Sequence, residues 1–285
     1  MPMLLIPALT IFFFSYAVFG FFLSKKLRRN DIVDVMWGPG IAGLSWVAYT
    51  ISGIGISWVL PLLVSIWALR LSFHIALRAG DHEDARYKTW RIQWMKRGER
   101  YFQIRSFLQI FVLQGLLMAV VALPIILAVY SGWGERIMWW QIIGLLVWIE
   151  GLTIETLADW QLSDFLERKH AGLESSSFMT RGIWSWSRHP NYFGEVELWW
   201  GIFLIALTPN APWTWLGIIS AVTITYLILK VSGIPMLEAQ FADDPEYQAY
   251  QKTTNAFIPW PPRQQKKQNT ESVQSVDKAD RDMVE

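Results

Sequence analysis

Several sets of ionisable and amide side chains in this sequence are spaced four residues apart within apolar stretches, which places each set on one face of a helix. The sets are Arg70, His74 and Arg78; Glu155 and Asp159; and Asn191, Glu195 and Trp199. Asp34 stands at the start of another apolar stretch. Ionisable groups inside hydrocarbon are costly unless they are paired or face a cavity, so we expect these residues to mark the functional site.

The densest polar cluster lies within residues 181–200, RGIWSWSRHPNYFGEVELWW. Its polar and turn residues are Arg188, His189, Pro190, Asn191, Tyr192, Gly194 and Glu195. Pro suits the first turn of a helix, and the free N–H groups of that turn favour an anion. Guanidinium, imidazole and amide donors beside such a helix start predict a receptor for phosphate or carboxylate. Glu195, one turn later, could hold ribose hydroxyls or a carboxamide.

The helices that position these residues are predicted to lie in a membrane. Hydrophobic residues make up 53% of the 285 residues, Trp occurs 18 times, and the 17% of charged residues fall in blocks between apolar runs. This pattern is typical of a chain whose solvent is mostly hydrocarbon, so we predict an all-α integral membrane protein. Cys is absent, which excludes disulfides, thiolate nucleophiles and thiolate metal sites, and no metal site is predicted.

Apolar runs long enough to cross about 30 Å of hydrocarbon, which takes roughly 20 helical residues, predict about seven transmembrane helices. They lie near residues 3–23, 35–54, 56–78, 106–130, 137–158, 191–208 and 212–231. The first run has no basic segment before it and no small-residue cleavage site after it. We therefore expect a retained helix and not a signal peptide.

The distribution of Lys and Arg predicts the orientation, because these residues stay on the cytoplasmic side of short loops. Basic residues follow the first run and occupy segments 79–105 and 159–190 and the end of the chain, whereas the opposite side holds Arg136. We expect the N-terminus outside and the C-terminus in the cytoplasm. Residues 1–263 would then form one membrane domain, and the polar residues 264–285 a disordered cytoplasmic tail.

Structural roles are alternatives for several of these residues. Asp34 could be a helix N-cap, whose carboxylate accepts N–H bonds from the first turn. Arg70 and Glu150 lie at comparable predicted depth, where an ion pair between helices is a simpler interpretation than catalysis. Arg78 and Arg181 could be interfacial residues whose charged ends reach water.

Several motifs recur in a fixed order along the chain. They are DVMWG at 34–38, RL at 70–71 with Arg78, DARY at 84–87 with WR at 90–91, Glu155 with Ala158, Asp159 and Gln161, RGIW at 181–184, SRHPNYFGE at 187–195, and Tyr247, Tyr250 and FIPWPP at 257–262. Together they resemble the steroid 5-alpha-reductase superfamily over residues 30–263, and most closely its bacterial branch of uncharacterised membrane proteins. The resemblance implies a bundle of seven helices that opens to the cytosol for NADPH.

The resemblance also implies roles for single residues. Asn191 and Glu195 fall on positions that look like nicotinamide and ribose ligands, Trp199 on a position that lines the site, and Asp159 on an Asp that contacts the cofactor. A phosphate suits the fork of a guanidinium. The residues expected on chemical grounds to contact the pyrophosphate or the 2′-phosphate are Arg86, Arg181 and Arg188.

The chain departs from this family where the substrate would bind. Steroid 5-alpha-reductases hold the enone carbonyl with a Glu and a Tyr, but at the place of that Tyr the third predicted helix has Ser72 or Phe73. The family's Arg/His/Tyr set before the C-terminal motif is replaced by SGIPMLE at 232–238. These departures disfavour a steroid substrate, and they leave Asp34 as the acid expected to polarise a carbonyl.

The sequence therefore predicts an NADPH-dependent reductase of CH–CH groups, embedded in a bacterial inner membrane with its site facing the cytoplasm. Its substrate would be a lipophilic enone, isoprenoid or sterol-like molecule from the bilayer, and no nucleic acid is expected as a partner. One alternative is an S-adenosylmethionine-dependent methyltransferase of the isoprenylcysteine carboxyl type, which shares the Arg-His-Pro-x-Tyr turn. Another is a non-enzymatic lipid-binding or transport bundle. The stretch from Asn191 to Trp199, with Asp159, favours the reductase.

Overall fold

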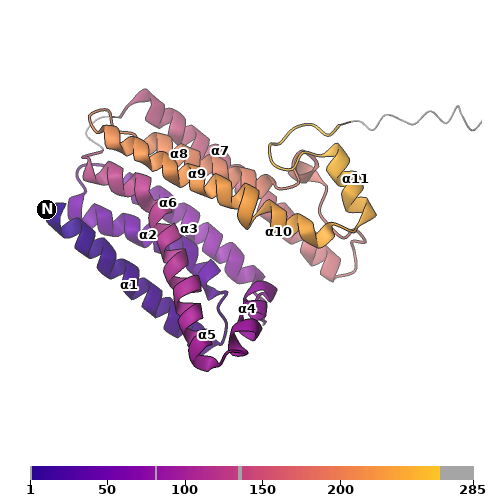
Figure 1. Cartoon of the computed structure of the whole chain (residues 1–285). Helices are drawn as coiled ribbons and strands as arrows, with labels where there is room; N and C mark the ends of the chain where they lie inside the picture. Colours follow the sequence, from indigo (N-terminus) through magenta and orange to yellow (C-terminus); the bar gives the residue numbers. More distant parts are fainter. Residues whose placement is uncertain (1, 81, 134–136, 264–285) are drawn as a thin grey trace, which may run out of the picture.

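A computed structural model describes residues 2–80, 82–133 and 137–263, and it confirms the predicted all-α architecture (Figure 1). The main helices are α1 (Pro2–Leu27), α2 (Ile32–Ser52), α3 (Val59–Arg78), α6 (Leu113–Tyr130), α7 (Trp139–His170), α8 (Pro190–Ala206) and α9 (Ile218–Tyr226). The shorter helices are α4 (Ala85–Met95), α5 (Glu99–Arg105), α10 (Ile234–Glu238) and α11 (Pro245–Thr253). The π-helical stretches are η1 (Ser106–Val112), which joins α5 to α6, and η4 (Leu227–Val231), which follows α9; the 3-10 turns are η2 (Gly182–Ser185), η3 (Pro212–Gly217) and η5 (Ala239–Phe241).

The long apolar helices identify an integral, multi-pass membrane protein. Five of them are long and apolar enough to cross a bilayer: Met3–Leu27, Val59–Arg78, Glu99–Tyr130, Trp139–His170 and Pro212–Phe241. The other two predicted spans are helical as well, as α2 and α8, but α8 has 17 residues and α2 contains Gly, Pro and Asp34. Helix α8 is therefore too short, and α2 not apolar enough, to be counted with these five spans. Helix α7 continues to His170, well beyond the predicted end of that span at 158.

Close glycine contacts join α7 and α8 as an antiparallel pair. A Cβ added at Gly194 would lie 2.5 Å from the carbonyl oxygen of Gly151, and one added at Gly201 would lie 2.7 Å from that of Gly144. The two glycines on each helix are two turns apart and therefore lie on the same face. Such contacts let helix backbones approach closely, which favours association where both partners are surrounded by lipid. The pairing brings the C-terminal half of α7 next to the first turns of α8.

A tryptophan pair connects this hairpin to the N-terminal helices. Trp67 of α3 and Trp199 of α8 pack edge to face with ring centroids 5.0 Å apart, and both are buried. Helix α2 packs against α1, α3 and α6, and α6 in turn contacts α8 and α9. These contacts form one apolar core in which α3 lies next to the α7–α8 hairpin.

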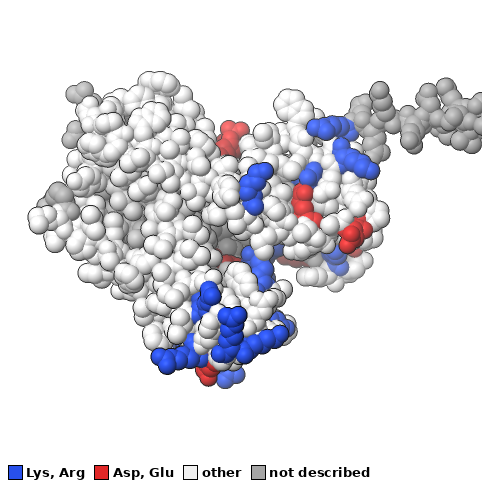
Figure 2. All heavy atoms as spheres, in the orientation of Figure 1, with Lys and Arg blue, Asp and Glu red and all other residues white. Residues whose placement is uncertain are grey.

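Charged side chains gather at one end of the bundle. On the face shown in Figure 2, Lys, Arg, Asp and Glu cover the parts that carry α4, α5, α10 and α11, whereas the remaining surface is almost entirely uncharged. The sequence assigns these charged segments to the cytoplasmic side. The orientation of the chain in the membrane stays a prediction. Arg136 and the predicted disordered tail 264–285 lie outside the described residues.

Candidate functional site

Arg70 of α3 is the centre of a buried polar cluster between α3, α7 and α8. Its guanidinium forms ion pairs with Glu155 and Asp159 of α7, and Nη2 also donates to the carbonyl oxygen of Glu155 at 3.2 Å. Glu155 and Asp159 are 2% and 6% exposed. The predicted ion pair between Arg70 and Glu150 is wrong, because Glu150 is exposed on α7 and Arg70 contacts the carboxylates farther toward the C-terminal end of that helix.

Two more side chains contact Asp159. His74 Nε2 lies 3.5 Å from its Oδ2, and Asn191 Nδ2, in the first turn of α8, donates to its Oδ1 at 3.1 Å. Only the nitrogen of an amide can donate to a carboxylate, so this bond fixes the orientation of the Asn191 amide. Among the described residues, Asn191 Oδ1 and Glu155 Oε2 are buried and have no hydrogen-bond partner. The cluster therefore contains two unused acceptors that a ligand could satisfy.

Glu195 adds a third carboxylate to this cluster. It lies one turn after Asn191 on α8, is half-buried, and is close enough to Arg70 and Asp159 for their charges to act on it. Three carboxylates then face one permanent cation. Because buried negative charge is costly when it is not compensated, the cluster favours a ligand that carries donors or positive charge.

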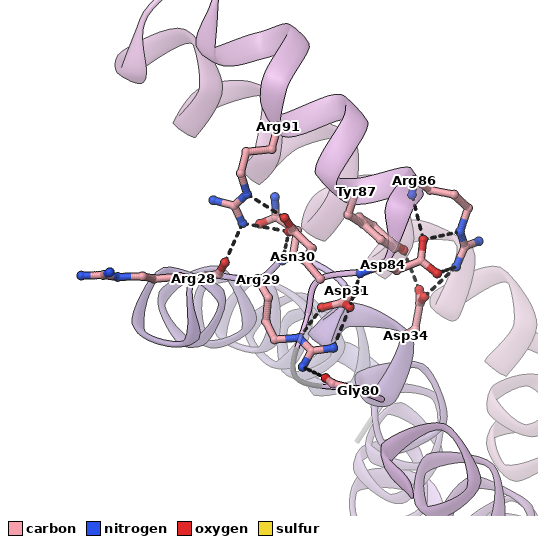
Figure 3. A network of polar contacts seen from close by, with 11 residues as sticks. Arg28, Arg29, Asn30, Asp31, Asp34, Gly80, Asp84, Arg86, Tyr87 and Arg91 are labelled. Carbon is pink, nitrogen blue, oxygen red and sulfur yellow. Dashed lines mark hydrogen bonds and ion pairs between the residues drawn. The ribbon is translucent and has the colours of Figure 1, made fainter. Parts of the chain in front are cut away.

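Asp34 belongs to a second polar group, at the start of α2 (Figure 3). Its Oδ1 accepts a hydrogen bond of 2.5 Å from Tyr87 Oη, and its Oδ2 accepts one of 3.1 Å from Arg86 Nη2. Burial, and then the charge of Asp34, raise the pKa of the Tyr87 phenol above its usual value, so this hydroxyl stays a donor. The N-cap alternative for Asp34 is wrong, because Asp31 holds that position and Asp34 lies inside the first turn.

Ser72 links the two polar groups. Its hydroxyl donates to the carbonyl oxygen of Val35 at 2.8 Å, which holds the first turn of α2 against α3 between the levels of Arg70 and His74. The serine at the place of the family's Tyr thus binds backbone. Tyr87 of α4 places a phenol beside Asp34. Its place beside Arg86 in the DARY motif was the one indication of this residue in the sequence.

The remaining predicted residues lie at the edge of the cluster or away from it. Trp199 is fully buried against Trp67, one turn beyond Glu195 on α8. Arg181 pairs with Glu174 at an exposed position. Arg188 contacts Glu238 at 2.8 Å and donates to the carbonyl oxygen of Thr254 at 2.6 Å, so it anchors the C-terminal segment to the start of α8.

His189 shares this anchor. Its Nε2 lies 3.0 Å from Oε1 of Glu238, and its ring stacks on Tyr192 with centroids 5.6 Å apart. Burial lowers the pKa of His189, and the Glu238 carboxylate opposes this effect only in part. Tyr192 is also close enough to Arg78 and Arg86 for their charges to act on its hydroxyl, so α4 and the end of α3 face the start of α8.

Comparison with known proteins identifies a family and a distant relative. Residues 20–254 match a family described as "Protein of unknown function (DUF1295)", a range that includes every residue of both polar groups. An uncharacterised protein of Schizosaccharomyces pombe is 24% identical to the chain over 274 aligned positions, which cover 83% of this chain and 74% of the yeast protein. No solved structure matches the chain.

Proposed function

The chain belongs to the DUF1295 family of proteins of unknown function, and we propose that it is a membrane-embedded, NADPH-dependent reductase of a lipophilic substrate. The observation that carries the proposal is the pair of buried, unused acceptors, Asn191 Oδ1 and Glu155 Oε2, beside the ion pairs of Arg70. The resemblance of the surrounding motifs to steroid 5-alpha-reductases supports the same cofactor.

These acceptors suit the nicotinamide end of the cofactor. A carboxamide NH2 group and ribose hydroxyls are donors, and Asn191, Glu155 and the half-buried Glu195 offer oxygen atoms to receive them. A bound NADPH would supply hydride chemistry, in which its nicotinamide ring gains positive charge. The excess of carboxylates around Arg70 would stabilise that charge in place, which is the electrostatic contribution expected of an enzyme.

The phosphates of the cofactor require cations at the outer edge of this cluster. Arg78 is exposed one turn after His74, with Nη1 3.5 Å from His74 Nε2, and Arg86 is exposed on α4. Both lie near Tyr192 and hence near the start of α8. We assign the phosphate contacts to these two arginines because both face the start of α8. Arg86 also pairs with Asp34 and Asp84 at its exposed position, whereas Arg188 is held by Glu238 and Thr254 and Arg181 pairs with Glu174.

Asp34 and Tyr87 are the proposed proton-handling pair: Asp34 would donate from its protonated form, which burial favours by raising the pKa of its carboxyl group. Reduction of an enone places negative charge on its oxygen, which an acid must stabilise or protonate. The Asp34 side chain is 27% exposed, whereas Tyr87 is 3% exposed, so Asp34 is the group that a substrate can reach. The Tyr87 hydroxyl acts through Asp34: it positions the carboxyl group and leaves the other oxygen toward Arg86.

A methyltransferase is the second candidate function. S-adenosylmethionine carries a sulfonium cation, and the carboxylate excess around Arg70 suits a fixed positive charge as well as a developing one. The two functions differ in which nucleotide the same residues would hold, so binding separates them without knowledge of the substrate.

Thermal unfolding of the detergent-purified protein, titrated with NADPH, NADH or S-adenosylmethionine, tests the proposal. We expect NADPH to raise the Tm with concentration, because a ligand that binds only the folded state stabilises it. Asn191→Ala, Glu195→Ala and Glu155→Gln should each weaken NADPH binding by about 1–3 kcal/mol, the cost of deleting a hydrogen bond to a buried or charged partner.

Glu150→Gln is the matched control for Glu155→Gln, because it makes the same chemical change at an exposed position of the same helix. Wild-type NADPH affinity in all three site variants would remove them from the site. Stabilisation by S-adenosylmethionine and not by NADPH would replace the reductase by the methyltransferase. Stabilisation by none of the three would contradict both and leave the non-enzymatic bundle.

A further inference from the structure

A polar cavity of about 160 Å³ lies between the end of α1 and the start of the α5–α6 helix, apart from both polar groups described above. Its polar lining includes Ser24, Lys25, Arg28, Asn30, Glu99 and Ser106. We propose that this cavity binds the phosphate group of a membrane phospholipid. The proposal is independent of the proposed reductase activity.

Asn30 provides a buried donor that no described residue uses. The side chain is 2% exposed, and its Oδ1 accepts a hydrogen bond of 3.0 Å from Ser106 Oγ. This bond fixes the amide, so that Nδ2 remains without a partner among the described residues. An unused buried donor is costly, and an anionic oxygen would satisfy it with a charge-assisted hydrogen bond. The backbone N–H of Asn30 is already held by Glu83 at 2.6 Å.

Two cations that line the cavity are available to an anion. Among the described residues, neither Lys25 nor Arg28 forms an ion pair, and Lys25 Nζ lies over the ring of Phe21 at 5.6 Å from its centroid. In Figure 3 the Arg28 side chain extends away from the network, while its backbone carbonyl accepts a hydrogen bond of 3.1 Å from Arg91. Arg91 itself is neutralised by two bonds of 2.8 Å to Glu83.

Glu99 limits the charge that the cavity accepts. Its carboxylate also lines the cavity, where it accepts a hydrogen bond of 3.0 Å from Gln103. Two free cations with one carboxylate leave a net charge of one, which balances the single negative charge of a phosphodiester. A free phosphate with close to two negative charges near neutral pH is a poorer match.

The segments that line the cavity also carry exposed apolar side chains, which suit the acyl chains of a lipid. Lys25 and Lys26 in the last turn of α1 mark the level of the membrane surface. Phe22 and Leu27 of α1 and Ile104 of α5 are large exposed apolar side chains, each next in sequence to a residue that lines the cavity. A ligand with a phosphate in the cavity and hydrocarbon along these side chains satisfies both features, which a soluble anion does not.

Single-charge variants with a matched control test this site. The probe is dioctanoyl phosphatidylglycerol, titrated into protein in an uncharged detergent while the Tm is followed. Lys25→Gln and Arg28→Gly each remove one lining cation, and Lys26→Gln removes a neighbouring charge that does not line the cavity. Arg28 has a φ of 56°, so glycine keeps the backbone there without strain.

We expect phosphatidylglycerol to stabilise the wild type and Lys26→Gln equally, and to bind Lys25→Gln and Arg28→Gly about tenfold more weakly, as expected for the loss of one charged contact. The Tm without lipid reports whether each variant folds. Two results would overturn the proposal: the same affinity in all three variants, or equal stabilisation of the wild type by inorganic phosphate or by dioctanoylglycerol, which lacks the phosphate.

Discussion

Asn191 of α8 donates a hydrogen bond of 3.1 Å to Asp159 of α7, and the same carboxyl group pairs with Arg70 of α3. One carboxylate therefore connects three helices at the centre of the candidate site. The connection orients the amide of Asn191 with its oxygen unused, which is the feature that the proposed cofactor requires. The stability of the bundle and the chemistry of the site thus depend on the same contacts.

Loss of Arg70 should destabilise the bundle strongly. Arg70→Met leaves Glu155 and Asp159 without their shared cation, and breaking a buried ion pair from one side costs about 3–5 kcal/mol. Arg78→Met removes the same charge from the exposed end of the same helix and should change stability little. Denaturant titrations of both variants in detergent measure the difference. Equal midpoints would show that the two carboxylates do not depend on Arg70.

A methyl group added at the close glycine contact between α7 and α8 should push these helices apart. In Gly194→Ala the new methyl group would lie 2.5 Å from the Gly151 carbonyl oxygen, so the backbones must move apart at a cost of about 1–3 kcal/mol. Gly80→Ala is the control, because a Cβ there meets no atom within 4 Å. We expect a lower Tm for the first variant and an unchanged Tm for the second. A wild-type Tm for Gly194→Ala would mean that the hairpin packs less closely than described.

Asp34→Asn tests the proposed proton donor. The substitution should preserve folding, since Asp34 is not the N-cap of α2, and NADPH binding, since the proposed nicotinamide ligands are on α7 and α8. Single-turnover oxidation of bound NADPH, with a substrate drawn from a lipid-extract screen, should slow by about 100-fold or more, in the range usual for a lost general acid.

Tyr87→Phe tests whether Tyr87 acts only by positioning the carboxyl group of Asp34. It leaves the carboxyl group in place without its 2.5 Å hydrogen bond, so we expect a smaller loss of rate and a shifted pH profile. Unchanged hydride transfer in the Asn variant would end the catalytic assignment of Asp34. The proposed binding of the cofactor at Asn191 would not be affected by that result.

Mild acid should loosen the anchor at the start of α8. Because the folded protein lowers the pKa of His189 below its ordinary value of 6.5, the neutral ring is favoured in the folded state. Its contribution to stability is therefore complete above pH 6.5 and is lost as the pH falls from there toward the folded pKa. The Tm should fall as the pH is lowered below about 6.5, and it should fall less in His189→Gln. Parallel pH dependence in the two proteins would assign the effect to other groups.

Helical spacing in the sequence was sufficient to predict which residues share a face. Glu155 with Asp159, and Asn191 with Glu195, lie as expected on the sides of α7 and α8 that meet α3. The blocks of charge in the sequence likewise gather at one end of the bundle (Figure 2). Both predictions hold because the period of a helix and the cost of charge in hydrocarbon are local properties of a sequence.

Partners across helices could not be predicted in the same way. Hydropathy gives the depth of a residue only to within a turn, and the register of α3 against α7 is set by packing, so Arg70 was assigned to Glu150 instead of Glu155 and Asp159. Tyr87 contacts Asp34 because α4 folds back onto the start of α2, and no periodicity in the sequence indicates this contact. The contact of Arg188 with Glu238 has the same origin.

The anchor of Arg188 has a consequence for the order in which the protein is made. Glu238 and Thr254 follow all the predicted spans in the sequence, so they are synthesised after α7 and α8. While α7 and α8 enter the bilayer, Arg188 cannot yet meet either of these partners, and the helix start that carries Asn191 is held by its hairpin alone. Assembly of the site is therefore a late event in biogenesis, completed only when the segment from Glu238 to Thr254 packs against the first turn of α8.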